Sequence, residues 1–179
     1  MTSFQNVDKL LLKINNLQDS VSKKEFEKVM NRANKQYVQA QAKLLCPVNH
    51  GELRNSIKTD VESSNNSVTA ITYTNAEHAS FVEFGTGPVG QANHDGISPN
   101  VSPTYSQHGW GIPADKVDPA DAIKYKWPKR TYGGKDYYMT SGQPAQPFIY
   151  PALKNNEDKV RDKVAKDLGK IIRKKVSSK

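Results

Sequence analysis

The chain has a single cysteine, and only 8% of its 179 residues are aromatic. One cysteine excludes an internal disulfide framework and suits a reducing compartment. Apolar residues make up 36% of the sequence and the mean hydropathy is −0.74, so we expect a modest core with long polar excursions. Cys46 lies between Leu45 and Pro47, where a small buried hydrophobic residue is a commoner role than a reactive thiol.

Long hydrophobic runs are also absent. No stretch approaches the ~20 apolar residues that a membrane-spanning helix needs, and the amino terminus lacks the basic and apolar regions of a signal peptide. We therefore expect a soluble protein made in a cytoplasm, with no membrane partner. The length suits one domain over 1–179, with N-terminal helices over 1–45, a strand region over 46–88, a long loop insertion over 89–136, and a final strand and C-terminal helix over 137–179.

The residue patterns of an active site are missing as well. Four histidines are present, but none has the spacing of a metal-ligand pair with a third ligand nearby. No nucleophile stands beside a base. The Gly85-Thr-Gly-Pro88 segment opens no predicted helix and no Lys-Ser/Thr follows it, so a phosphate cradle is a poor fit. We therefore expect no catalytic residue, no metal ion and no cofactor.

The net charge of +8 is distributed unevenly. Residues 1–45 carry eight Lys/Arg against four Asp/Glu, and residues 154–179 carry ten against four, whereas residues 46–88 carry two against five. A basic helix can follow nucleic acid, although a solvated helix face is the commoner explanation. Opposite charges on different segments also favour docking of one subunit on another. Composition does not separate these three interpretations.

Helical spacing of apolar residues predicts helices at both ends of the chain. A short helix is expected over 7–17. The capping box Ser22-Lys-Lys-Glu25 starts a second helix over 22–45, which Pro47 ends, and a basic helix is expected over 152–175. The apolar stripe of the second helix is predicted to be Phe26, Val29, Met30, Ala33, Tyr37, Ala40 and Leu44.

Strands are predicted between these helices. Segments 57–62 and 67–74 form a hairpin, 79–84 continues as a third strand, and 137–140 returns as a further strand. Residues 89–136 show no periodicity and predict a long irregular insertion, which is usually functional. The fold class is therefore expected to be α+β: an antiparallel sheet of about four strands with a long N-terminal and a long C-terminal helix packed on it, plus the insertion.

The turn after 79–84 is expected to use its glycines for positive φ or close backbone approach. Glu83 is expected to pair with Arg54 or to accept hydrogen bonds from the Gly85-Thr86-Gly87 backbone.

The insertion mixes aromatic and basic side chains. This mixture suits a binder of single-stranded nucleic acid or a protein interface, and we favour the interface. Because fixing each residue's backbone costs roughly 1–2 kcal/mol, we expect so polar a segment to become ordered on a partner. The candidate assembly residues are Trp110, Trp127, Arg130 and Tyr132.

Three segments occur in a fixed order around the insertion: Cys46-Pro-Val-Asn-His-Gly-Glu-Leu-Arg-Asn-Ser-Ile57 (the first motif), Ala79-Ser-Phe-Val-Glu-Phe-Gly-Thr-Gly-Pro88 (the second) and Gln146-Pro-Phe-Ile-Tyr-Pro-Ala-Leu153 (the third). Together they resemble the neck protein family of long-tailed bacteriophages, also called head–tail joining or tail-completion proteins. The resemblance implies structural or interfacial roles for Pro47, Gly51, Leu53, Arg54, Ser56, Glu83, Gly85, Thr86, Gly87, Pro147, Phe148 and Pro151.

Some positions depart from the family pattern. Cys46, His50, His78 and Gln146 stand where the pattern has alanine, threonine, tyrosine and arginine. These differences change side-chain contacts and keep the turn-forming positions. The insertion is longer than in the family, so its role is not implied by the resemblance.

The resemblance implies a non-enzymatic late protein of the virion that joins the tail tube to the DNA-filled head. It would act as a subunit of a homo-oligomeric ring, expected to be sixfold, after assembly in the host cytoplasm. Implied partners are other copies, neighbouring neck proteins and the tail terminator or tail tube, with the phage DNA in the lumen as a further candidate. The alternatives are a tail terminator or head-closure protein at an adjacent neck level, and a basic DNA-binding protein.

Overall fold

The structure is a computed structural model that describes residues 21–65 and 67–177. The helix predicted over 7–17 lies outside the described residues. The helical elements are α2 (Lys23–Asn34), the π-helical segment η1 (Lys35–Gln39), α3 (Ala40–Leu45), α4 (Glu52–Ser56), α5 (Ala79–Phe84), α6 (Gly87–Ala92), the 3-10 turn η2 (Ala114–Lys116), α7 (Pro119–Lys124), α8 (Ile149–Lys154) and α9 (Glu157–Ser177). The strands are β1 (Lys58–Ser63), β2 (Val68–Tyr73), β3 (Trp110–Pro113), β4 (Lys129–Tyr132) and β5 (Lys135–Thr140).

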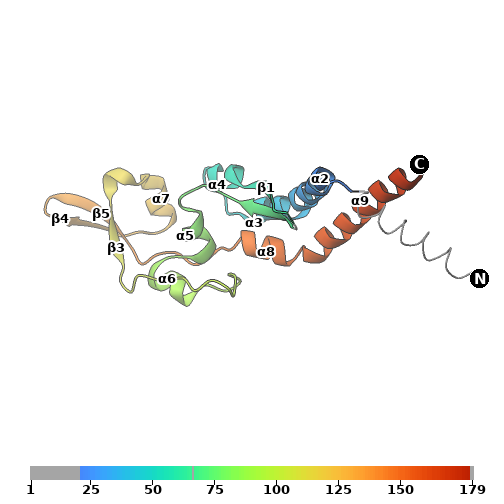
Figure 1. The fold of residues 1–179 in the computed structure, drawn as a ribbon. Helices are drawn as coiled ribbons and strands as arrows, with labels where there is room; N and C mark the ends of the chain where they lie inside the picture. The colour runs from blue at the N-terminus through green and yellow to red at the C-terminus, as the bar shows by residue number, and fades with distance from the viewer. Residues whose placement is uncertain (1–20, 66, 178–179) are drawn as a thin grey trace, which may run out of the picture.

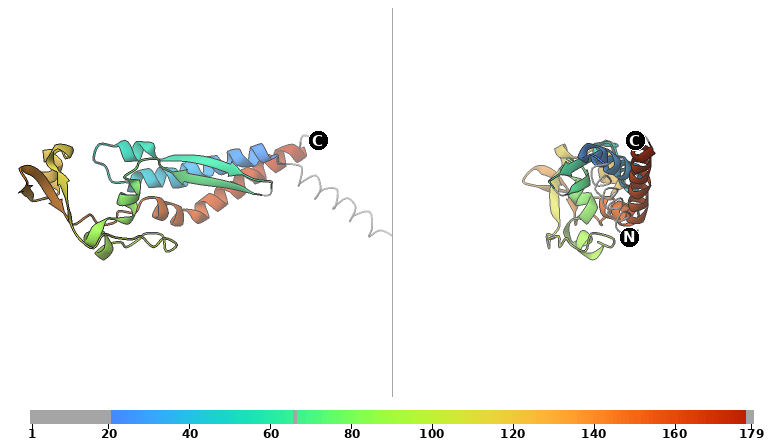
Figure 2. Two further views of the ribbon diagram at one scale, coloured as in Figure 1. Left: turned by 60° about the vertical axis from the view of Figure 1, so that its left-hand side comes forward. Right: turned by 45° about the vertical axis from the view of Figure 1, so that its right-hand side comes forward.

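The molecule is elongated, with a helical stack at one end and a small sheet at the other (Figures 1 and 2). Helices α2 and α9 form the end that carries the C-terminus, and strands β3, β4 and β5 lie at the far end. The fold class is α+β, as predicted, but the strands form two separate sheets. The prediction of one sheet of about four strands is therefore wrong.

Helix α2 begins at the predicted capping box. The Ser22 hydroxyl accepts a hydrogen bond from the Glu25 amide at 3.3 Å, and the Glu25 carboxylate accepts one from the Ser22 amide at 2.9 Å, so free donors of the first turn are satisfied. The helix predicted over 22–45 corresponds to α2, η1 and α3 in direct succession. It ends at Cys46, whose ψ of 122° is extended because a proline follows.

The π-helical segment changes which face of this helix is buried. The apolar positions buried along it are Val29, Ala33, Val38, Ala42 and Cys46, and the polar Asn34 is buried as well. The step between the apolar positions Ala33 and Val38 is five residues long because a π turn adds a residue to the helical turn. The predicted stripe therefore fails beyond Ala33: Leu44 is 75% exposed, and Val38 and Ala42 occupy the core instead.

The predicted hairpin is confirmed. Strands β1 and β2 pair antiparallel, with Lys58 opposite Tyr73 and Ser63 opposite Val68. Helix α2 packs against both strands, and the Asn34 side-chain amide donates to the Thr72 hydroxyl at 2.9 Å. Helix α9 packs mainly against α2 and η1. The prediction that α9 packs on the sheet is therefore wrong, and the order of the layers is hairpin, α2, α9. A sheet of two strands ~5 Å apart is too narrow to seat two helices of ~10 Å diameter side by side.

The strand predicted over 79–84 is wrong, because these residues form helix α5. Ala79 and Glu83, one helical turn apart, are its buried positions. The glycines that follow open helix α6, with Pro88 in its first turn, whereas no helix was expected there. A short apolar run such as Phe81-Val-Glu-Phe84 suits either a strand or a helix, and its contacts decided for the helix.

The insertion over 89–136 is not irregular throughout. It contains β3, η2, α7 and β4, and β5 lies between β3 and β4 in a three-stranded antiparallel sheet. Gly133 and Gly134, which connect β4 to β5, have φ values of 58° and 76°, as a two-residue type I′ hairpin turn requires. The strand predicted over 137–140 is confirmed within β5. The expected ordering of the insertion on a partner stays a prediction.

The C-terminal helix is broken where a continuous one was predicted. Helix α8 ends at Lys154 and α9 begins at Glu157. Asn156 is buried in the break, donates its side-chain amide to the Ala152 carbonyl at 2.8 Å, and accepts from the Val160 amide at 2.9 Å. One core joins α8 to the rest of the body, and its buried members are Val38, Ala42, Cys46, Leu53, Ile57, Ala79, Phe148 and Ala152.

The end of α9 is tied to the start of α2, and this contact makes stability depend on pH. Lys175 Nζ lies 2.6 Å from Glu25 Oε2, and this hydrogen bond, with those from Ser22, lowers the pKa of Glu25 from 4.5 to about 2. Because the folded-state pKa is the lower one, the stabilisation is present above pH ~4.5 and is lost as the pH falls towards 2. We expect the Tm difference between wild type and Glu25→Gln to be constant above pH 5 and to shrink below pH 4.5. Lys175→Gln should remove most of the same pH-dependent part, and equal Tm profiles for wild type and Glu25→Gln would contradict the assignment.

Candidate functional site

The three motifs share one hydrophobic core, and the second and third meet at the buried carboxylate of Glu83. Helix α5 directs this side chain, which is 6% exposed, towards the start of α8. Its Oε2 accepts hydrogen bonds from the amides of Phe148 at 2.7 Å and Ile149 at 3.0 Å, and its Oε1 accepts one from the Tyr150 amide at 3.0 Å. These amides are free donors of the first helical turn, and the negative charge also suits the positive end of the helix. Glu83 therefore caps α8 and joins the second motif to the third.

Neither predicted partner of Glu83 is the one observed. Within the described part of the chain, no ion pair joins Glu83 to Arg54, and the hydrogen bonds go to α8 and not to the Gly85–Gly87 backbone. Arg54 instead donates to the Cys46 carbonyl at 3.5 Å, and its Nε is buried without a hydrogen-bond partner. Cys46 is buried as predicted, and burial raises the pKa of its thiol.

The first motif contributes a turn and two core residues. Gly51, with φ at 85°, precedes α4, which follows the half-buried Pro47 by one short loop. Leu53 and Ile57 point into the core, at 6% and 0% exposure. Ser56 donates to the Leu53 carbonyl at 2.8 Å and shares a hydrogen bond with the Thr74 hydroxyl. The motif thus closes the end of helix α3 onto the first strand of the hairpin.

The glycine turn of the second motif confirms the expected positive φ. Gly85 has φ at 76° and Gly87 at 60°. A Cβ on Gly85 would lie 2.7 Å from the Ala145 amide nitrogen, and one on Gly87 would lie 2.6 Å from the Ser141 carbonyl oxygen. Between them, Thr86 pairs with Gln143 as an isolated antiparallel bridge, with N–O distances of 2.9 and 3.2 Å. Both glycines are needed because another segment of backbone passes against them.

The third motif forms the start of α8, the helix that Glu83 caps. Phe148 is fully buried and occupies the N-cap position of α8, where Pro151 lies in the first turn. Pro147 is half-buried and lies before it. The Gln146 amide donates to the Val82 carbonyl at 2.8 Å, so the chain enters α8 alongside α5.

Two residues of the junction were missed in the sequence. Gly142 has φ at 95°, and a Cβ there would overlap the Thr86 carbonyl oxygen. Gln143 forms the bridge to Thr86 and also donates its side-chain amide to the Phe81 carbonyl at 2.9 Å. The Ser-Gly-Gln segment has the composition of any loop, so no local signal assigns it a partner.

The four candidate assembly residues are not gathered into one cluster. Trp110 lies on β3, is 37% exposed and lies against the Gly87 backbone. Trp127 follows α7 and stacks on Tyr125, with ring centroids 5.3 Å apart. Arg130 and Tyr132 lie two residues apart on β4, so they share one face of the strand, and both are exposed. The sheet therefore separates Trp110, which contacts the glycine turn, from the exposed pair at its far edge.

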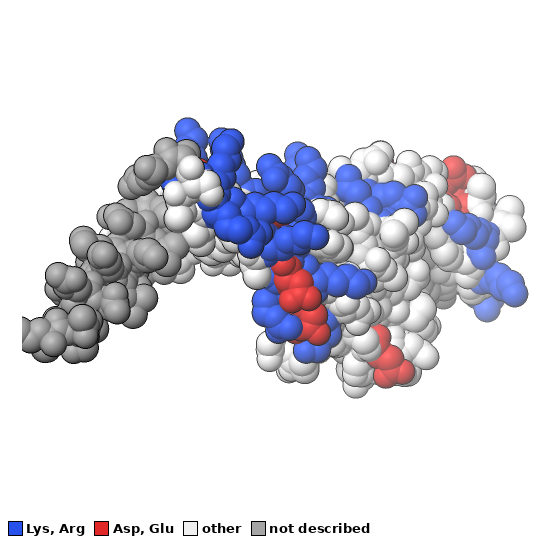
Figure 3. Space-filling view, turned by 90° about the vertical axis from the view of Figure 1, so that its right-hand side faces the viewer, with Lys and Arg blue, Asp and Glu red and all other residues white. Residues whose placement is uncertain are grey.

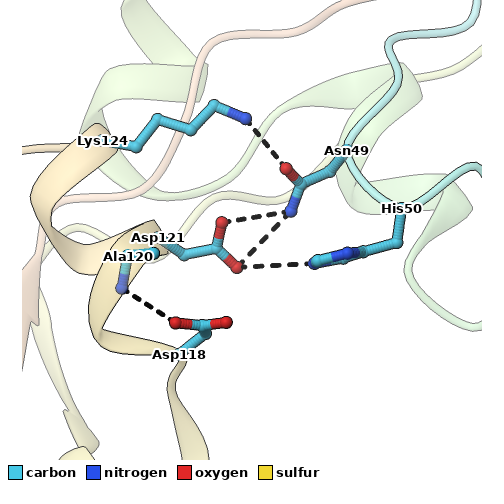
Figure 4. Close-up of polar contacts among 6 residues, drawn as sticks. All are labelled: Asn49, His50, Asp118, Ala120, Asp121 and Lys124. Atoms are coloured by element: carbon cyan, nitrogen blue, oxygen red, sulfur yellow. Dashed lines mark hydrogen bonds and ion pairs between the residues drawn. The ribbon is translucent and has the colours of Figure 1, made fainter.

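A second polar contact ties helix α7 to the loop of the first motif (Figure 4). The Asn49 amide donates to the Asp121 carboxylate at 3.2 and 3.4 Å, and its side-chain oxygen accepts from Lys124 Nζ at 2.8 Å. His50 Nε2 lies 3.8 Å from the same carboxylate. The Asp118 carboxylate caps α7 through the Ala120 amide at 2.8 Å. The insertion thus touches the body at both the first and the second motif.

Beside the junction lies an open, mainly apolar hollow of about 440 Å³ between β2, α5 and α8, lined by Tyr73, Phe84, Ile149 and Leu153 among others. Across the described residues, no group of three or more His, Cys, Asp or Glu side chains is placed to hold a metal ion. Within residues 21–65 and 67–177, no helix combines the length and apolar character that crossing a bilayer takes. The site is therefore a junction of two backbone segments, around Glu83–Thr86 and Gln143–Phe148, held together by hydrogen bonds.

Comparison with protein families gives a match over residues 8–85, to a family model described as Bacteriophage HK97-gp10, putative tail-component. No curated protein and no solved structure matches the chain. The matched range holds the first motif and the second up to Gly85, and leaves the insertion and the third motif outside. The predicted resemblance to a phage neck and tail-completion family is therefore confirmed over residues 8–85, which match the HK97-gp10-like family of bacteriophage tail components.

Proposed function

We propose that this protein is a structural, non-enzymatic subunit of the phage neck that joins the tail tube to the DNA-filled head. It acts in the virion as one subunit of a sixfold ring, after late synthesis and assembly in the host cytoplasm. The observation that carries the proposal is the Glu83 junction, in which residues of the second motif cap the helix of the third. The match of residues 8–85 to a tail-component family supports it.

The Glu83 junction suits a protein that holds two binding partners, one at each end, in a fixed relative orientation. The helical stack lies at one end of the elongated molecule and the β3–β5–β4 sheet at the other (Figure 2). The Thr86–Gln143 bridge and the Glu83 cap lie between these ends and hold residues 83–86 against residues 143–150. A joining protein needs such a rigid centre, because each end must present its surface to a different partner in a fixed orientation.

Two surfaces support contacts with other copies or neck proteins. Arg130 and Tyr132 extend from the far edge of the small sheet, where Tyr132 is 60% exposed, and arginine and tyrosine are enriched at protein interfaces. The hollow beside β2 carries Tyr73 at 37% and Leu153 at 46% exposure. Exposed apolar surface next to a hollow is typical of an interaction site. Partners assigned to these surfaces are other copies of the chain, neighbouring neck proteins and the tail terminator or tube.

Electron microscopy of particles made without this protein tests the assigned level of the neck. We expect DNA-filled heads and complete tails that remain separate. Heads that lose their DNA would assign the protein to head closure, and tails of irregular length would assign it to tail termination. Either result would overturn the joining role.

The double substitution Arg130→Ala/Tyr132→Ala tests the far edge of the sheet. Both side chains are exposed, so we expect the free energy of unfolding to change by less than about 0.5 kcal/mol, while head–tail joining by the variant falls at least tenfold. Joining is measured as infectious particles formed on complementing the deletion phage. Arg161→Ala, which removes a 72% exposed guanidinium from α9, is the matched control and should join normally. Full joining by the double variant would remove this edge from the interface.

A further inference from the structure

Four lysines form one stripe along helix α9. Lys159, Lys163, Lys166 and Lys170 follow one another at i, i+4, i+7 and i+11, which places them on a single face of the helix. They line a hollow of about 490 Å³ together with Tyr37 and Gln36 of η1. One carboxylate, that of Asp162, shares the hollow. The stripe is therefore a concave surface with four ammonium groups against one carboxylate.

Neighbouring helices extend this basic surface. Figure 3 looks at the end of the molecule formed by α2 and α9, and Lys and Arg side chains cover much of it. Lys35 of η1 is exposed next to the Gln36 and Tyr37 side of the hollow. Arg32 of α2 reaches across to α9, with its guanidinium 3.9 Å from the buried Asp167 carboxylate.

Two carboxylates, those of Asp162 and Asp167, lie close to the four ammonium groups of the stripe. Lys163, at 22% side-chain exposure, lies 3.0 Å from Asp167 Oδ2, and this contact, ahead of the charges of Lys170 and Arg32, lowers the pKa of Asp167. Lys159 donates to the neutral Asn156 side chain, at 3.3 Å. Lys166 and Lys170 are exposed. Since like charges at i, i+3 and i, i+4 repel, an external polyanion would relieve the repulsion along this face.

We propose that the lysine stripe of α9, with the hollow that it forms against η1, binds the phosphate backbone of double-stranded nucleic acid. The eleven steps from Lys159 to Lys170 span ~16 Å at 1.5 Å per residue, the length of about five base-pair steps of 3.4 Å. Evenly spaced ammonium groups match a backbone of evenly spaced phosphates, whereas an acidic protein surface has no such repeat. Lys159, Lys166 and Lys170 contact phosphates, and Lys163 is held by Asp167. The inference does not depend on the joining role, since it concerns the purified protein and free duplex.

The test measures binding of the full-length protein to a fluorescent 20-base-pair duplex by anisotropy, between 50 and 200 mM KCl. The variant is Lys166→Gln/Lys170→Gln, in which glutamine preserves helix propensity. Each phosphate contact contributes about −0.9 to the slope of log K against log salt. We therefore expect the slope to weaken by about 1.8 and the affinity at 0.1 M salt to fall on the order of 50-fold.

The control is Lys116→Gln/Lys135→Gln, which removes the same charge from two exposed lysines on the far sheet and its connection. It should leave the slope unchanged. An equal loss in the control would show that net charge alone drives binding and would overturn the site, as would the absence of duplex binding at 50 mM salt. Polyglutamate of matched charge should compete poorly. Competition as strong as that of unlabelled duplex would show that the stripe binds an acidic protein surface and is not specific for nucleic acid.

Discussion

Replacement of Glu83 by glutamine is expected to destabilise the protein by about 3 kcal/mol. The carboxylate accepts hydrogen bonds from three amides of α8, at 2.7, 3.0 and 3.0 Å. Hydrogen bonds to a charged acceptor contribute about 1.5–3 kcal/mol each, and a buried donor left without a partner costs ~1–3 kcal/mol. Glutamine keeps one acceptor oxygen and turns an NH₂ group towards amides that are themselves donors, so part of the set is lost.

Urea unfolding measures this effect. Glu77→Gln is the matched control, because Glu77 is exposed and lies shortly before α5, the helix that carries Glu83. The control should change the free energy of unfolding by less than about 0.5 kcal/mol. Amide hydrogen exchange should also speed up at Phe148, Ile149 and Tyr150 in Glu83→Gln alone. Equal stability of wild type and Glu83→Gln would show that the cap of α8 does not hold the three motifs together.

Two glycines with the same φ are expected to tolerate alanine very differently. Gly85 and Gly134 both have φ at 76°, but the ψ of Gly85 is 176°, a combination that is essentially restricted to glycine and costs another residue about 1–3 kcal/mol. At Gly134, in the hairpin turn, alanine introduces a strain of about 1 kcal/mol. A Cβ at Gly134 meets nothing within 4 Å, whereas one at Gly85 lies 2.7 Å from the Ala145 amide nitrogen and 2.9 Å from the Gln143 carbonyl oxygen. Overpacking against backbone adds about 1–3 kcal/mol. We expect a loss of about 3 kcal/mol for Gly85→Ala and about 1 kcal/mol for Gly134→Ala.

The difference between the two variants, measured by urea unfolding, reports the two features specific to Gly85: its ψ of 176° and the close approach of residues 143–145. Gly85→Ala should also weaken the Thr86–Gln143 bridge, which amide exchange at these two residues detects. If both variants lose the same free energy, neither the ψ of Gly85 nor the neighbouring backbone restricts this position to glycine. The junction would then not depend on the packing of backbone against backbone.

Local signals account for the elements that the sequence predicted well. The capping box at Ser22 and Glu25 is satisfied within four residues, and the hairpin over 57–74 depends on alternation and on a polar turn. Positive φ at Gly85 and Gly87 follows from the lack of a Cβ. The Gly133-Gly134 turn is a similar local signal for a hairpin, which was overlooked.

Other features depended on contacts that no local pattern contains. The π-helical segment η1 moved the buried face from Tyr37 to Val38, and nothing in the apolar spacing marks where a turn takes in an extra residue. The apolar run in 79–84 suited a strand or a helix equally. The two separate sheets likewise depend on β3 and β4 pairing with β5 and not with the first hairpin.

The sequence by itself determined the start of α2, the first hairpin, the positive φ of the glycine turn and the family resemblance of the three motifs, because each depends on residues close together in the chain. Only the tertiary structure decided what Glu83 binds, since its partners lie 65 to 67 residues away. It also decided that the lysines of α9 line a hollow against η1. The physical reason is the same in both cases: a buried carboxylate and a like-charged stripe take their partners from whichever segment packing brings near, and packing is a property of the whole chain.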